Sequence, residues 1–222
     1  MLQFYEAYDI LRLIVFSALV KNSYHNVVNE YLVGWVKGMG KVKFVAFFRG
    51  IYVGGKNIVK MSALSQLFIS LGFHDIKTYI QSGNVIFSSD IEQHLLIPLI
   101  EQAFEEQFGF SSAVVIRSGG EIERVVDSLP FVAEEIEQAQ NENPDVEYIY
   151  IYLSNNTIDV EKVNQLCSSY NGKDKFHIMN REIYLLCFQS IRDSKLATTL
   201  MKLPQPLTSR NFKTMEKISS MF

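Results

Sequence analysis

The clearest pattern in the chain is an apolar run that begins at Lys41 and ends at Phe48. It alternates at first and then becomes continuously apolar, which predicts a buried strand. Apolar residues then recur at i, i+3, i+4 and i+7 from position 64 to position 71, which predicts one face of a helix. Gly72 follows, where a helix commonly ends. We therefore expect a strand and then a helix over residues 41–72.

Two strand-like segments, DIKTYIQ and NVIFSS, come next and flank the pair Ser82-Gly83. Two short strands separated by so few residues predict a hairpin with a tight turn. Either Gly83 or Asn84 would adopt a positive φ in that turn, because glycine and asparagine tolerate this conformation best.

A second helical segment runs to Phe108. Asp90 could cap its start, but Pro98 would then lie in its interior, so the helix either begins near Ile97 or is kinked. The segment SSAVVIRS that follows predicts another strand. The resulting order, β-α-β-β-α-β, is that of a ferredoxin-like split βαβ unit.

The rest of the chain repeats much of this order. A short helix and the polar stretch QAQNENPDVE lead to the alternating strand YIYIYLS. A helix, a hairpin around Asn180-Arg181 and two more helical segments follow, which gives β-α-β-β-α. We therefore predict an α+β protein with two tandem ferredoxin-like units (α/β plaits). The first covers residues 39–118, and the second covers residues 119–222 with a C-terminal helix.

Residues 1–38 do not fit this scheme. Their apolar run, ILRLIVFSALV, is shorter than the roughly 20 residues of a spanning helix, and acidic residues precede it where a signal peptide has basic ones. We expect an atypical N-terminal extension outside the main fold. The alternative is an additional helix that packs on the first unit.

Composition narrows the class of protein. The 48% hydrophobic and 20% charged content predicts a packed globular core, and the net charge of -3 argues against general nucleic-acid binding. Cys167 and Cys187 fall at apolar positions, so we expect two buried free thiols, which suits the cytoplasm. The four histidines are scattered and no CxxC occurs, so no metal site is expected.

The stretch AFFRGIYVGGKN is the first candidate site. Arg49 ends the apolar strand, and the polar loop residues that could bind a ligand are Gly54, Gly55, Lys56 and Asn57. Backbone N–H groups of a glycine loop can converge on an anion at the start of a helix. The stretch matches neither GxGxxG nor GxxxxGK[ST], however. The alternative is therefore a structural turn in which the glycines supply positive φ and Asn57 caps the helix.

The hairpin turn should lie beside this loop. In the split βαβ topology the second strand runs parallel to the first, so its turn is at the same end of the sheet as the loop. The turn contributes Gln81, Ser82, Gly83 and Asn84. Near the end of the chain, LTSRNFKT adds Arg210 and Asn211 just before a helix, where Arg210 could bind a phosphate or a carboxylate. Asn211 or Ser209 could cap that helix.

Two long motifs, FFRGIYVGGKNIVKMSALSQLFISLGFHDIKTYIQSGNVIFSS and LTSRNFKTMEKI, resemble the domain of unknown function 1697 family of mostly bacterial proteins. The resemblance covers residues 41–222 and implies two ferredoxin-like units in tandem. It implies no activity. Two positions depart from the family pattern, since Tyr52 stands where the family has Asn and Phe212 where it has Trp.

We expect a module that binds a small anion, such as a phosphorylated ligand, through the loop, the hairpin turn and Arg210. An interaction domain without a ligand is the first alternative. An enzyme of unknown reaction is the second, although no nucleophile and base stand at a recognisable spacing. The sequence identifies no cofactor, catalytic residue or oligomeric state.

Overall fold

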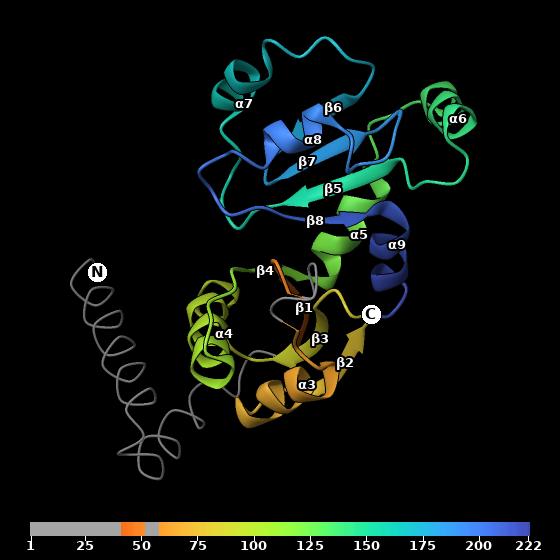
Figure 1. Cartoon of the computed structure of the whole chain (residues 1–222). Helices are drawn as coiled ribbons and strands as arrows, with labels where there is room; N and C mark the ends of the chain where they lie inside the picture. Colours follow the sequence, from red (N-terminus) through yellow and green to blue (C-terminus); the bar gives the residue numbers. More distant parts are fainter. Residues whose placement is uncertain (1–40, 52–57) are drawn as a thin grey trace, which may run out of the picture. The chain divides into compact units, whose positions relative to one another are not determined.

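A computed structural model describes residues 41–51 and 58–222 of the chain. The chain divides into two compact units, residues 1–41 and 42–222, and the described elements lie in the second. The elements of the first half are β1 (Val42–Phe48), α3 (Met61–Ser70), β2 (His74–Tyr79), β3 (Asn84–Ser89), α4 (Gln93–Phe108), β4 (Val114–Ser118) and α5 (Gly119–Asp127) (Figure 1). The elements of the second half are α6 (Ala133–Glu142), β5 (Ile149–Leu153), α7 (Val160–Cys167), β6 (Lys175–Met179), β7 (Glu182–Leu186), α8 (Lys195–Leu200), β8 (Thr208–Asn211) and α9 (Phe212–Ser219).

The described strands form two four-stranded antiparallel sheets. Their strand orders are β2-β3-β1-β4 and β6-β7-β5-β8, which are the same order in the two halves. The prediction of an α+β protein is therefore confirmed.

The two sheets also share one register. Phe47 lies opposite Asn84 in the first sheet, as Leu153 lies opposite Glu182 in the second. On the other side of the central strand, β4 pairs with β1 in the same register in which β8 pairs with β5. The paired residues of β1, β3 and β4 therefore have equivalents in β5, β7 and β8, whereas β2 matches β6 only from Lys77 on, because a bulge shifts its register after His74. We use "equivalent" below in this sense of matched register.

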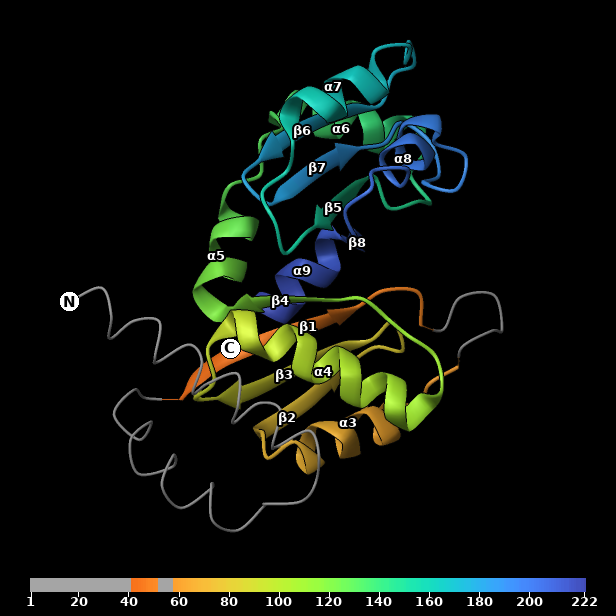
Figure 2. The same cartoon turned by 90° about the vertical axis from the view of Figure 1, so that its left-hand side faces the viewer.

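Three layers of apolar side chains hold the sheets and helices together. A phenylalanine-rich cluster packs α3 and α4 on the outer face of the first sheet, and a second cluster packs α7 and α8 on the outer face of the other. The third cluster joins the two inner faces to α5, α9 and Ala139 of α6. Both views show α5 and α9 between the sheets (Figures 1 and 2). Burial of this shared core stabilises both halves together.

The structure changes two details of the prediction. Helix α4 begins at Gln93 with Glu92 as its N-cap, so Pro98 does lie inside it and neither a start near Ile97 nor a cap by Asp90 is correct. Pro98 stands in the second turn, where its missing N–H leaves the carbonyl of His94 without its helical donor.

The second sheet also contains a strand that the sequence did not predict. Strand β8 has the sequence TSRN, which carries no apolar alternation, and it forms because it pairs with β5.

Candidate functional site

The hairpin turn contacts the end of β1, whereas the glycine loop predicted to lie beside this turn is outside the described residues. The N–H of Phe48 donates to the carbonyl oxygen of Gly83 at 2.9 Å. Gly83 has φ +75°, as the prediction required of Gly83 or Asn84. A Cβ on Gly83 would lie 2.2 Å from Cδ1 of Ile51, so the turn can approach β1 only because residue 83 has no side chain.

Arg210 reaches this junction from β8 and binds it through two of its guanidinium nitrogens, Nε and Nη2. Its Nε donates to Oδ1 of Asn84 at 2.6 Å, and its Nη2 donates to the carbonyl oxygen of Phe48 at 3.0 Å and to that of Ser82 at 2.9 Å. Its Nη1 donates to the hydroxyl of Thr208 at 2.9 Å and to a carbonyl of its own strand. The ring of Phe47 lies under the guanidinium, 5.5 Å from its central carbon.

These acceptors are all neutral, although the side chain is buried. Within the described part of the chain no carboxylate pairs with Arg210, and burial lowers the pKa of its guanidinium to about 10. Carbonyl and amide dipoles stabilise the cation, but they do not cancel its charge. The junction of β1 and the hairpin turn therefore carries a positive charge that no carboxylate of the described segments compensates.

Arg117 is the equivalent of Arg210 in the first half, and it does have a counter-ion. Its Nη2 lies 2.8 Å from Oε1 of Glu182, and its Nη2 also donates to the carbonyl oxygen of Ser154. Burial lowers the pKa of Arg117, while the charge of Glu182 opposes that shift. Glu182 is the equivalent of Asn84, and Ser154 is the equivalent of Phe48. Each half thus inserts an arginine into the hairpin end of the other, but among the described residues only Arg117 meets a carboxylate.

Arg49 lies at the rim of the junction, one residue beyond Phe48. Its backbone is fixed by hydrogen bonds to Ala113 and Ser112, while its side chain is exposed. No ion pair joins Arg49 to an acidic residue of segments 41–51 and 58–222. Gln81, on the hairpin turn, is likewise exposed.

The other predicted site residues have different positions. Asn84 is buried, and its Nδ2 donates to the carbonyl of Tyr79 and to the hydroxyl of Ser82, both at 3.0 Å. Asn211 caps α9 by accepting from the N–H of Thr214 at 2.9 Å. Gly54, Gly55, Lys56 and Asn57 lie outside the described residues, and so does Tyr52.

Sequence reasoning missed the reciprocal role of Arg117. A signal was present, because Arg117 and Arg210 each stand immediately before the N-cap of a helix, Ser118 for α5 and Asn211 for α9. Without the strand register of the two sheets, however, no feature of the sequence indicated that the two positions are equivalent.

Other classes of site find no support in the described segments. No group of three or more His, Cys, Asp or Glu residues there could hold a metal ion, and no helix there could cross a membrane. Cys167 and Cys187 are free and buried, as predicted.

The fold and the junction define a class: an α+β protein of two matched antiparallel sheets joined by exchanged arginines. The chain belongs to the family described as "Protein of unknown function (DUF1697)", whose model matches residues 42–184. It is similar in structure to the conserved bacterial protein SP0830 from Streptococcus pneumoniae, with 28% sequence identity and a TM-score of 0.64. That similarity covers 82% of this chain and 99% of the other. No curated protein matches the sequence.

Proposed function

We propose that the protein binds a small anionic ligand at the junction of β1 and the hairpin turn. In this proposal Arg49 and Gln81 contact the ligand, and Arg210 contributes positive potential from beneath. The observation that carries the proposal is the uncompensated charge of Arg210, in contrast to the Arg117–Glu182 pair at the equivalent position.

The physical reason is electrostatic. A buried cation without a counter-ion costs free energy, and an anion bound nearby recovers part of that cost. The exposed guanidinium of Arg49 offers a planar set of donors that suits phosphate or carboxylate oxygens. Ser82, Gly83 and Asn84 form the floor of the site and hold Arg210 in place. Gly54, Gly55, Lys56 and Asn57 remain candidates from the sequence, as does Asn211 next to Arg210.

We also propose that the fold consists of two ferredoxin-like plaits and that the protein is a cytoplasmic protein of a bacterium. The strand order and the helices on the outer faces support two ferredoxin-like plaits, with topological boundaries at 39–118 and 119–222 after the extension 1–38. The two free thiols support a reducing cytoplasm as the compartment. The similarity to a Streptococcus protein supports a bacterial source.

A thermal-shift screen with inorganic phosphate, sugar phosphates, nucleotides and small carboxylates tests the binding proposal, because a ligand that binds the native state raises the apparent Tm. We expect at least one anion to stabilise the protein. Arg49→Ala should leave the Tm without ligand nearly unchanged and abolish the shift. Arg192→Ala is the matched control, since Arg192 is also exposed, and it should keep the shift. An equal shift in wild type and Arg49→Ala would exclude this site.

A further inference from the structure

A groove on the inner face of the first sheet carries opposite charges that do not pair. It has a volume of about 390 Å³ and lies near the start of β1, away from the junction at the end of that strand. Its lining residues are Lys43, Asp75, Ile76, Lys77, Ile86, Ser88 and Met221. Asp75 and Lys77 are exposed, while Ile86 and Ser88 are buried and form the floor. A cavity of this size suits a small molecule.

A β-bulge turns Asp75 into the groove. The pairing of β2 with β3 shifts between His74 and Lys77, so that two residues of β2 oppose one residue of β3, and Asp75 has φ +53°. Aspartate is one of the few residues other than glycine that adopt this left-handed conformation. A bulge commonly re-aims a side chain at a functional site. Strand β6, at the equivalent edge of the second sheet, pairs with β7 without such a shift. The bulge is therefore not required by the fold that the two halves share.

Neither of the exposed charges has a counter-ion. No ion pair joins Asp75 or Lys77 to a residue of segments 41–51 and 58–222, and none joins the two to each other. Lys43 differs, because its ammonium donates to the main-chain oxygen of Phe222 at 2.7 Å and so forms part of the wall. Within these segments, the carboxylate of Asp75 and the ammonium of Lys77 are therefore both available to a ligand.

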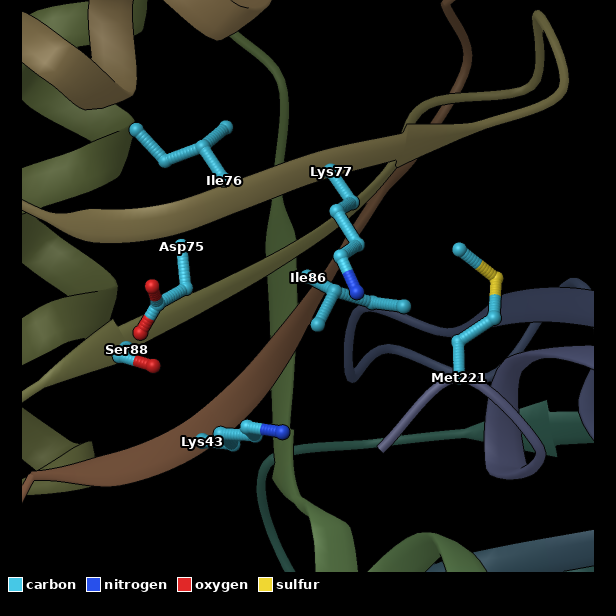
Figure 3. Close-up of a pocket in the computed structure, with 7 residues that line it drawn as sticks. All are labelled: Lys43, Asp75, Ile76, Lys77, Ile86, Ser88 and Met221. Atoms are coloured by element: carbon cyan, nitrogen blue, oxygen red, sulfur yellow. The ribbon is translucent and has the colours of Figure 1, made fainter.

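Figure 3 shows how these groups are arranged. The side chain of Lys77 extends toward Ile86, with the carboxylate of Asp75 on one side and Met221 on the other. A ligand ammonium would thus meet Asp75, and a ligand carboxylate would meet Lys77. The apolar part of the ligand would lie on Ile86 and Met221.

The protein itself closes the equivalent part of the second sheet. His177, the equivalent of Lys77, packs edge-on against Phe131 with 5.3 Å between the ring centroids. Tyr184, the equivalent of Ile86, donates its hydroxyl to a carbonyl oxygen of α5 at 2.9 Å. The matched register thus leads to a filled surface in one half and to a groove in the other.

We propose that this groove binds a small zwitterion whose ammonium and carboxylate are separated by an apolar body, as in an apolar dipeptide. The ligand would satisfy both free charges at once, whereas a molecule with one charge would leave either Asp75 or Lys77 without a partner. The groove lies at the opposite end of β1 from the anion site. Either proposal can therefore fail without the other.

Isothermal titration calorimetry of the full-length protein with three related compounds tests both charged contacts. We expect leucylleucine to bind with a Kd below about 1 mM. N-acetyl-leucylleucine lacks the ammonium, and leucylleucinamide lacks the carboxylate. Each should bind at least about tenfold more weakly, because each loses a hydrogen bond between charged groups.

Substitutions assign each contact to one residue. Asp75→Asn keeps a residue that tolerates the left-handed conformation, and it should weaken leucylleucine at least about tenfold while leaving the affinity for the N-acetyl compound unchanged. Lys77→Gln should likewise weaken leucylleucine but not leucylleucinamide. Asp145→Asn and Lys202→Gln make the same changes at other exposed positions and should not alter the affinity for leucylleucine.

Methyl NMR locates the bound dipeptide. The resonances of Ile86 and Met221 should shift on titration, and shifts centred on another region would overturn the proposal. Absence of saturable binding, or equal affinity for the three compounds, would overturn it as well. So would self-association of Asp75→Asn in a protein that binds no dipeptide, because the bulge and its charge would then serve to protect the edge strand β2.

Discussion

Arg117 and Arg210 occupy equivalent positions on β4 and β8, and each donates into the hairpin end of the opposite half. The two arginines differ in what receives the charge, which is Glu182 for Arg117 and Asn84 for Arg210, and Arg210 also donates to the carbonyl oxygen of Ser82. The change from a carboxylate to an amide therefore separates a buried ion pair from a buried arginine that no carboxylate of the described segments neutralises.

Removal of one partner of the Arg117–Glu182 pair should strongly lower the free energy of unfolding. Arg117→Met leaves a buried carboxylate without its cation, which costs about 3–5 kcal/mol. The double variant Arg117→Met/Glu182→Leu should recover most of this loss, because both charges are gone. Urea denaturation of the two variants measures the difference. Equal destabilisation in the single and double variants would contradict the assignment of a compensated pair.

Asn84→Asp should weaken ligand binding. The new carboxylate would give Arg210 the counter-ion that Arg117 already has, so the junction would no longer attract an anion. The Tm shift produced by the anion that stabilises the wild type most should therefore shrink. Asn171→Asp adds the same charge at an exposed position and should leave the shift unchanged. A full shift in Asn84→Asp would show that the charge of Arg210 plays no part in binding.

Gly83→Ala should be more destabilising than Gly109→Ala. The two glycines have nearly the same φ, +75° and +76°, so an alanine at either position suffers the same conformational strain of roughly 1 kcal/mol. Only at position 83 does the new Cβ also collide with Ile51, while open space surrounds position 109. The difference between the two free energies of unfolding isolates the cost of that collision. If the two losses are the same, β1 and the turn are not in close contact.

Cys187 should make the protein less stable at alkaline pH. Burial of the thiol, helped by the nearby Asp174, raises its pKa from 9.0 to about 12. The unfolded chain then releases this proton above pH 9 while the native chain keeps it, so stability is full below pH 9 and falls as the pH rises toward 12. The slope approaches about 1.4 kcal/mol per pH unit. Between about pH 8 and pH 10, the free energy of unfolding of Cys187→Ala should change less with pH than that of the wild type.

Local patterns were sufficient for the elements whose side chains alternate or repeat. They predicted β1, the β2–β3 hairpin and the turn glycine, because each depends on nearby residues. They were insufficient for β8, where Thr208 to Asn211 form a strand only through pairing with β5. Arg210 was expected to bind a phosphate or a carboxylate, yet in the structure it binds carbonyls and an amide from β1 and the hairpin. Those acceptors lie more than 120 residues away in sequence, and only the tertiary fold brings them near.

The insertion of an arginine from each half into the other has a consequence for how the protein unfolds. If the chain opened between the halves, the carbonyl of Phe48 and the amide of Asn84 would lose their donor, and Glu182 would face water without its cation. Neither half can melt without exposing the polar groups and the inner face of the other. We therefore expect residues 42–222 to unfold in a single cooperative transition, and a fragment that ends after Ser118 not to persist as a native-like domain.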